Sequence, residues 1–211
     1  MSSRFLKVQM SVVGATLSIA MLLFAAQRRD SAPTPQFRAV IDLSTTTNPK
    51  DLGQTLFVAP AHWGGVWTMD SMPPVRLVAP LAVIRAERKH FPDSESLITM
   101  DDVASYEREH GPVPQGAVVL VNSIASGIAP RFEGDALRFL AEARNVVGIG
   151  NGGSEVVDPQ LGSYLASKGI YELRDVHDLD LLPRSGAITI VAPQHMSGAS
   201  EGPARIMALL R

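Results

Sequence analysis

His62 is the strongest candidate in this chain for metal or acid–base chemistry, and Asp70 is a carboxylate close to it in the sequence. They lie in one short segment that also contains the chain's two tryptophans, Trp63 and Trp67. Together with His195 they would supply a His/His/carboxylate set with one position left for water, whose pKa a bound zinc lowers toward about 7. Nothing in the spacing requires these three residues to converge, and one histidine alone does not hold a metal.

The sequence does not contain the residues or motifs of several other common catalytic and binding sites. The chain contains no cysteine, which excludes disulfides, thiolate metal sites and a cysteine nucleophile. Ser123 and Ser126 have no G-x-S-x-G context, so a serine hydrolase triad is not supported. The glycine-rich stretch 148–154 follows an expected strand but carries no lysine, and Glu155 after it would repel phosphate. We interpret that stretch as a turn.

The composition predicts one folded domain of ordinary size. The chain has 211 residues, of which 45% are hydrophobic and 19% charged. A full hydrophobic core is therefore available, and disorder is not expected beyond the tails. The net charge is -2 and there is no basic patch, so the sequence does not favour a nucleic-acid partner.

The N-terminus has the layout of an export signal. Arg4 and Lys7 precede an apolar run from Val8 to Ala26, and a basic start followed by an apolar stretch is typical of signal peptides. The cleavage signal after this run is poor, and about 19 apolar residues can just span a bilayer. Residues 1–27 are therefore expected to be either a signal peptide or an uncleaved signal anchor. Both place the domain outside the cytoplasm, after a polar linker at 28–38.

Strands and helices are expected to alternate along the rest of the chain, which implies an α/β domain. The segment Leu77–Ile84 forms either one strand or two strands split by Pro80. The Thr99 hydroxyl and the Asp102 carboxylate form a capping box at the start of a helix. Strands are expected at Val40–Leu43, Thr55–Val58, Leu77–Ile84, Val118–Val121, Val146–Ile149 and Ile188–Val191, and helices at 99–109, Gly134–Ala143, Pro159–Ser167 and Pro203–Leu210.

Several pieces of the chain, in order, resemble the cyclase family, which includes the bacterial kynurenine formamidases. The pieces are V-I-D-L-S at 40–44, I-T-M-D-D at 98–102, H-G-P-V-P-Q-G at 110–116, V-G-I-G at 147–150 with V-D-P at 157–159, L-D-L-L-P at 179–183 and G-P-A-R at 202–205. No single piece is specific, but six pieces in this order are fairly specific for the fold of the family. The resemblance implies a cyclase-like swivelling β/β/α domain over 39–211, with strands curled into a barrel-like core.

The same resemblance shows that the segment after His62 has lost most of a metal motif. The family carries H-x-G-T-H-x-D-x-P-x-H here. The first histidine is His62 and the glycine is Gly64, but the second histidine falls on Val66, the aspartate on Thr68 and the last histidine on Met72. Valine has no donor atom, a threonine hydroxyl is a poor ligand, and a thioether is a soft and weak one.

The remaining ligands implied by the family are also replaced. They are a histidine and, twelve residues later, a glutamate, which fall on Gly162 and Arg174. A permanent cation at Arg174 repels a divalent metal. It could instead replace the metal's charge, by pairing with Asp70 or by binding an anionic ligand. Glu172 shares a strand face with Arg174 and is a candidate for catalysis after a small shift, as is His195, which falls at the end of the family's last core strand.

Two interpretations of the tryptophans stay open. Trp63 and Trp67 form a stacking floor for an aromatic or sugar-like ligand, or they fill the volume that the lost metal and ligands leave. In the first interpretation the ligand-binding residues are Trp63, Trp67, Asp70 and Arg174.

Two functions follow from the resemblance. The first is an exported homologue with a degraded metal site that acts as a non-catalytic ligand-binding or partner-binding module, with no cofactor. The second is an active amide or lactone hydrolase of the arylformamidase type, acting in tryptophan–kynurenine catabolism through a rearranged zinc or manganese site. The expected partners are a small molecule, a second copy of the chain and, if the N-terminal segment is uncleaved, the membrane.

Overall fold

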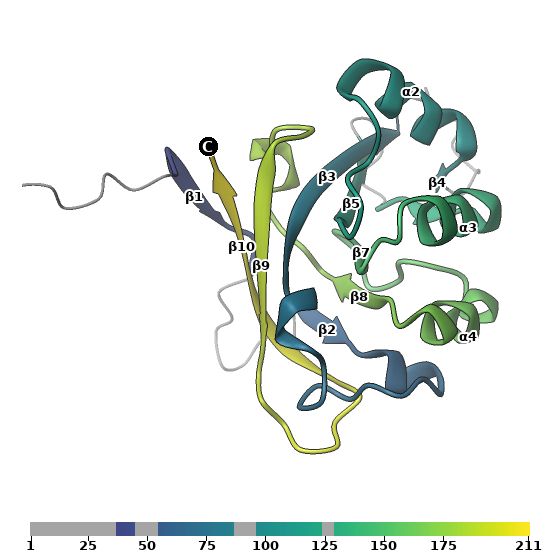
Figure 1. Cartoon of the computed structure of the whole chain (residues 1–211), viewed down its shortest axis with the longest axis vertical. Coiled ribbons are helices and arrows are strands. Elements are labelled where there is room, and N and C mark those ends of the chain that lie inside the picture. The colour runs from purple at the N-terminus through teal and green to yellow at the C-terminus, as the bar shows by residue number, and fades with distance from the viewer. Residues whose placement is uncertain (1–36, 45–54, 87–95, 124–128) are drawn as a thin grey trace, which may run out of the picture. The chain divides into compact units, whose positions relative to one another are not determined.

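A computed structural model describes residues 37–44, 55–86, 96–123 and 129–211 (Figure 1). The expected signal segment 1–27 and most of the expected linker lie outside these residues. Within them, no helix is both long enough and apolar enough to cross a membrane.

Eight of the ten described strands form one sheet that closes on itself, and the other two pair with each other. The order of the eight is β1-β10-β2-β8-β7-β5-β3-β9, and β9 also pairs with β10, which completes the ring (Figure 1). The strand β1 pairs only with the end of β10 and lies outside that ring. The bounds are β1 Ala39–Asp42, β2 Leu56–Val58, β3 Val78–Ala86, β5 Val118–Ser123, β7 Gly148–Asn151, β8 Tyr171–Arg174, β9 Ala187–Pro193 and β10 Glu201–Leu210.

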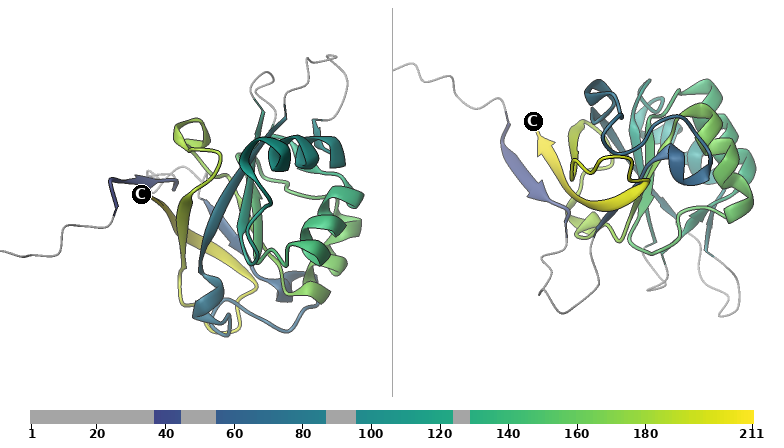
Figure 2. Two further views of the ribbon diagram at one scale, coloured as in Figure 1. Left: turned by 45° about the horizontal axis from the view of Figure 1, so that its top comes forward. Right: turned by 90° about the horizontal axis from the view of Figure 1, so that it is seen from below.

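In the described part of the chain, three α-helices cover the parallel part of the sheet, formed by β3, β5, β7 and β8, on its outer side (Figure 2). These are α2 Met100–His110, α3 Gly134–Ala143 and α4 Pro159–Lys168. The shorter described elements are β4 Leu97–Ile98, β6 Arg131–Phe132 and the 3-10 helices η1 Pro60–Trp63, η2 Pro74–Arg76 and η3 Leu179–Leu181.

Two apolar cores follow from the alternation of side chains along the strands. In β5, Val118 and Leu120 point into the barrel, while Val119 and Val121 point toward the helices. The sequence of a strand that is buried on both faces is an unbroken run of apolar residues, which is typical of parallel sheets covered by helices. The apolar run at Val118–Val121 therefore predicted a buried strand correctly.

Most predicted elements are confirmed. The helix α3 has the predicted bounds, and α2 begins at the predicted capping box, where Asp102 Oδ2 accepts from Thr99 N at 2.8 Å. The segment around Pro80 is one strand. Pro80 lies where β3 is paired with β9 and has not yet begun to pair with β5, so the missing N–H breaks no ladder there.

The predicted final helix at Pro203–Leu210 is wrong, because this segment is the strand β10. Its residues include good helix formers, but Ile206 and Ala208 are fully buried while Met207 and Leu209 between them are only partly buried. This period of two fits a strand. Pairing with β9 and β2 overrides the local preference.

Glu107 joins α2 to the turn after α3. Arg144 donates to both of its carboxylate oxygens, at 2.7 and 2.8 Å, and Val113 N donates to it at 3.0 Å. The hydrogen bond from Arg144 is the largest of the effects that hold the pKa of Glu107 below its usual value of 4.5. A lowered folded-state pKa stabilises the fold above the unfolded pKa, and this stabilisation is lost as the pH falls through the lower folded value.

We expect Glu107→Gln to lower the free energy of unfolding by about 1–3 kcal/mol at neutral pH, because the charged hydrogen bonds are weakened. The deficit should shrink at an acid pH well below 4.5, where the wild-type carboxylate also becomes protonated. Urea denaturation at both pH values measures this. Glu109→Gln, on the same helix with a half-exposed side chain, is the control and should stay within about 0.5 kcal/mol. An equal loss of unfolding free energy at both pH values would contradict the conclusion that the charge of Glu107 stabilises the fold.

Candidate functional site

A buried carboxylate, Glu172, lies at the centre of the candidate site. Its side chain is 2% exposed, and each of its oxygens has a partner. The indole Nε1 of Trp63 donates to Oε1 at 2.7 Å, and Arg174 donates to Oε2 through Nη2 at 2.9 Å and Nε at 3.2 Å. We refer to Trp63, Glu172 and Arg174 as the Trp–Glu–Arg cluster. It satisfies a charge that would otherwise be costly to bury.

Strand alternation sets the position of this cluster. Tyr171 and Leu173 of β8 point into the barrel core, so Glu172 and Arg174 point to the outside, toward α4. The antiparallel partner β2 places Val58 opposite Glu172. The helix η1 begins two residues after β2 and carries its last residue, Trp63, to the same side. The expectation that Glu172 and Arg174 share a face is confirmed.

The Trp63 ring packs directly on α4 at Gly162. A Cβ atom at Gly162 would overlap the ring, well inside the 3.0 Å that real Cβ atoms keep. No residue with a side chain therefore fits at position 162 while Trp63 keeps its place. Since the family resemblance puts a histidine ligand at this position, the tryptophan fills the space that such a ligand would need.

The second tryptophan repeats this arrangement at the other end of α4. The ring of Trp67 lies against Gly169, the C-cap of the helix, which adopts a left-handed conformation with φ of 66°. The Arg76 guanidinium lies 4.9 Å from the Trp67 ring centroid and donates to Gly169 O at 2.9 Å. Burial lowers the pKa of Arg76 and raises that of Tyr171, whose hydroxyl donates to Arg76 O at 3.0 Å. These contacts support the volume-filling interpretation.

His62 pairs with a carboxylate outside the Trp–Glu–Arg cluster. Its Nδ1 lies 3.4 Å from Glu201 Oε2, and its ring meets the Trp63 ring edge-on, with centroids 4.7 Å apart. The imidazole is 29% exposed. This one histidine and one carboxylate are too few to hold a metal by themselves.

Asp70 fastens one loop to another. It accepts from Thr68 Oγ1 at 2.6 Å and from Gly198 N, in the loop between β9 and β10, at 3.2 Å. The Thr68 hydroxyl is the largest of the effects that lower the pKa of Asp70. Of the two roles considered for Arg174, pairing with Asp70 is not seen in this structure, where Arg174 pairs with Glu172.

The other predicted positions do not converge. Val66 is 90% exposed, whereas Met72 is buried in the barrel core. His195 is exposed in the loop between β9 and β10. Among the described residues no group of three or more His, Cys, Asp or Glu side chains is placed to hold a metal ion. His62, Asp70 and His195 do not form such a group among the described residues.

Some neighbours of the site had no signal in the sequence. Glu201, beside His62, lies far away along the chain. Arg76, beside Trp67, follows it by nine residues through a loop. The one available signal was the presence of glycines at 162 and 169, since a glycine in or after a helix can mark the close approach of a large side chain.

Comparison with known proteins defines the class of this fold and site. A sequence profile described as "Putative cyclase" matches residues 24–153. An isatin hydrolase from Roseibium aggregatum is 28% identical over 187 residues, which cover 74% of this chain and 70% of the relative. The chain therefore belongs to the cyclase family and is a homologue of its hydrolases.

Solved structures agree on the fold. Isatin hydrolase A from Labrenzia aggregata, bound to benzyl benzoate, matches with a TM-score of 0.71 and 23% identity, over 82% of this chain and 93% of that one. A protein described as a potential metal-dependent hydrolase with cyclase activity matches with a TM-score of 0.61 and 21% identity, over 82% of this chain and 98% of that one. The mixed α/β fold with a closed, barrel-like sheet is thereby confirmed.

We expect Gly162→Ala to destabilise the protein by about 1–3 kcal/mol, because the new methyl group displaces Trp63 from Glu172. This loss should outweigh the ~1 kcal/mol that alanine normally gains over glycine inside a helix. Gly134→Ala is the matched control, since its new Cβ would meet only Leu161 side-chain atoms at 3.7 and 3.9 Å. Urea denaturation measures both variants.

A double-mutant cycle makes this test specific. In a Trp63→Ala background the obstacle is gone, so Gly162→Ala should become neutral or stabilising. A loss of equal size in both backgrounds would mean that Trp63 does not fill the space at Gly162.

Proposed function

We propose that this chain is a non-catalytic member of the cyclase family that acts as a ligand-binding or partner-binding module. The observation that carries the proposal is the overlap of the Trp63 ring with the space above Gly162. A chain that had merely lost a ligand would leave a cavity at that point. Here a bulky side chain from a different element occupies it and is hydrogen-bonded in place. A fold can persist in this way after its chemistry is gone.

The residues present do not fit a zinc or manganese centre. Of the six positions that the family resemblance assigns to ligands, only His62 carries a good donor. Position 162 has no room for an imidazole, and Arg174 would place a fixed cation beside the metal. Val66 points to solvent and Met72 into the core, so restoring donors there would not by itself build a site.

The candidate catalytic residues are also poorly placed for proton transfer. A general base needs a lone pair directed at the proton it removes. Both oxygens of Glu172 already accept hydrogen bonds, and the side chain is buried. His195 is exposed on a loop. These observations support a structural role for Glu172.

One observation favours the alternative of an active hydrolase, which is the 28% identity to an isatin hydrolase across most of both chains. On that hypothesis the protein adds water across an amide C–N bond, in a cyclic amide such as isatin or in an N-formyl arylamine. A metal site would then have to form around His62 from residues that do not converge in the described structure.

We expect the purified full chain to contain well under one zinc or manganese per chain and to hydrolyse neither isatin nor N-formylkynurenine. Elemental analysis without a histidine tag and an absorbance assay for ring opening measure this, with the isatin hydrolase of Roseibium aggregatum as positive control. The non-catalytic proposal would be abandoned if one metal per chain accompanied hydrolysis that His62→Ala abolished. A rise in melting temperature with a small molecule, in metal-free protein, would support binding.

We further propose that the module works outside the cytoplasm, because the segment 1–27 has the composition of an export signal. A fusion of the full chain to alkaline phosphatase, which is active only after export, should be active in a bacterial host. The same fusion without residues 1–27 should be inactive. Equal, low activity of both fusions would count against export.

A further inference from the structure

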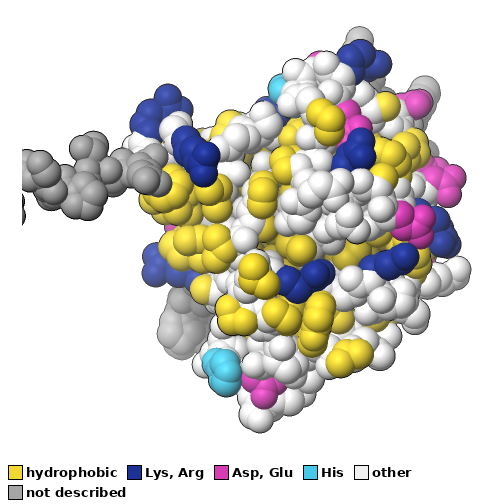
Figure 3. All heavy atoms as spheres, in the orientation of Figure 1, with side chains coloured by type: hydrophobic (Ala, Val, Ile, Leu, Met, Phe, Trp, Pro, Cys, Tyr) yellow, Lys and Arg dark blue, Asp and Glu magenta, His cyan; other side chains and the backbone are white. Residues whose placement is uncertain are grey.

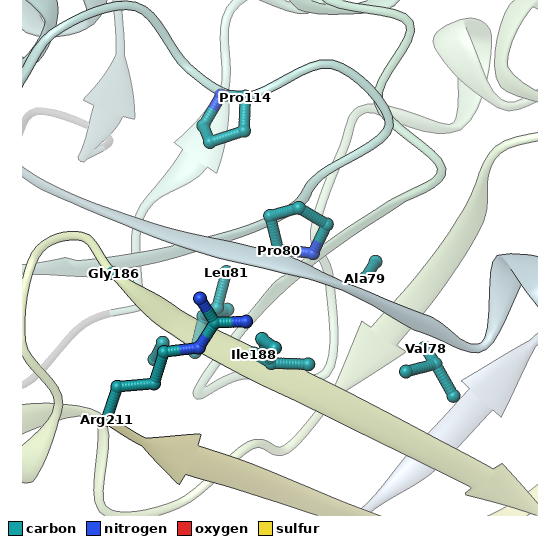
Figure 4. Close-up of a pocket in the computed structure, with 9 residues that line it drawn as sticks. Val78, Ala79, Pro80, Leu81, Pro114, Gly186, Ile188 and Arg211 are labelled. Carbon is teal, nitrogen blue, oxygen red and sulfur yellow. The ribbon is translucent and has the colours of Figure 1, made fainter. Parts of the chain in front are cut away.

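An open groove of about 370 Å³ lies on the outside of the sheet, where the first half of β3 pairs with the first half of β9 (Figure 4). This volume is at the lower end of the range for small-molecule pockets, roughly 300–1,000 Å³. The groove is separate from the Trp–Glu–Arg cluster, since β5 and β7 lie between β3 and β8 in the sheet. Its lining residues are Val78, Ala79, Pro80, Leu81, Pro114, Gly186, Ala187, Ile188 and Arg211.

The barrel does not use the apolar walls of this groove for its own core. Ala79 and Leu81 are directed into the barrel and are buried there, so Val78 and Pro80 face outward. Val78 keeps 54% of its surface exposed. In the described part of the chain α2, α3 and α4 lie on the opposite side of the ring from β9 (Figure 2), and hydrophobic side chains gather around β9 (Figure 3). An exposed apolar surface that is also hollow is a candidate binding site.

Arg211 supplies the one charged side chain among the described residues that line the groove. The other lining residues carry hydrocarbon side chains or, at Gly186, none, and the two prolines, Pro80 and Pro114, have no backbone N–H. A neutral polar ligand would therefore find few partners here, and burying a polar group without a hydrogen bond is unfavourable. A ligand with an apolar body and one anionic group fits these residues better.

The register of β10 brings Arg211 to the groove. Leu209 pairs with Ile188 of β9, so Arg211, two residues further on, reaches the level of Gly186. Gly186 adopts a φ of 86°, and a Cβ atom there would meet nothing within 4 Å, so this end of the groove is open. The Arg211 guanidinium extends over the groove toward Leu81 and Ile188 (Figure 4).

Among the described residues none pairs with the Arg211 guanidinium, whereas Arg205 of β10 already pairs with Asp42 at 2.8 Å. A guanidinium is always charged and can hold a carboxylate through two parallel hydrogen bonds. We propose that the groove binds a small monocarboxylate with an apolar body, such as a medium-chain fatty acid or an arylalkanoic acid, with its carboxylate on Arg211. The inference goes beyond the proposed function and does not depend on it, because the groove would offer the same contacts in a catalytic chain.

Isothermal titration calorimetry of the full chain, with nothing added after Arg211, tests the ligand class with octanoate and 4-phenylbutanoate as probes. At least one carboxylate should bind about fivefold more tightly than its uncharged primary amide, because an exposed ion pair contributes modestly. This preference should fall as salt is raised, since salt screens the pair. The tighter of the two probes identifies an aliphatic or an aromatic body. Equal binding of carboxylate and amide would overturn the proposal. So would no binding of either acid, as expected if a second copy of the chain covers the groove.

Matched variants of the full chain locate the site. Arg211→Gln should weaken binding of the tighter acid about fivefold and leave binding of its amide unchanged, whereas Arg205→Gln, the same change of charge outside the groove, should alter either by less than about twofold. Val78→Asp should also weaken binding of the acid, because it places a second carboxylate beside the bound one. Val75→Asp, at an 81% exposed valine outside the groove, is its control. Binding that survives both groove variants would overturn the proposal, and melting temperatures show that each variant is folded.

Discussion

The closure of the sheet by β10 is the constraint on which the rest of this structure depends. The first residues of this strand pair with β2 and its last with β1, while its other edge pairs with β9. Without it, β2 and β9 would each expose a row of unpaired backbone groups. Closure also fixes the direction of every side chain in the ring, since alternate residues must point inward and outward. The apolar interior and the Trp–Glu–Arg cluster are two consequences of that alternation.

In the Trp–Glu–Arg cluster, the alternation of side chains along β8 buries a charged carboxylate, and neighbouring groups compensate for that burial. Once Tyr171 and Leu173 are directed into the barrel, Glu172 must be buried on the other side, beneath η1 and α4. A buried carboxylate is strongly unfavourable unless it is paired and hydrogen-bonded. The Arg174 guanidinium and the Trp63 indole provide both. The balancing cation therefore comes from the same strand as the carboxylate.

Much of the fold could be predicted from the sequence, because its signals are local. The Thr99–Asp102 capping box located α2, and the apolar periodicity located α3. β10 was missed because its alanine, methionine and leucine residues favour helix, and only pairing with distant strands makes it extended. The shared face of Glu172 and Arg174 followed from a period of two. The contact of Trp63 with Gly162 could not be predicted, since no local rule brings η1 against α4.

The filled space at Gly162 also bears on the proposal that this chain is non-catalytic. A bound metal contributes its binding energy to folding. On this proposal, Trp63 packed on Gly162, Trp67 packed on Gly169 and the ion pair of Glu172 with Arg174 supply the stability that a bound metal would otherwise supply. The same contacts leave no room for a side chain at position 162 and place a fixed cation at position 174. Restoring donors one at a time would therefore destabilise the protein before any metal could bind.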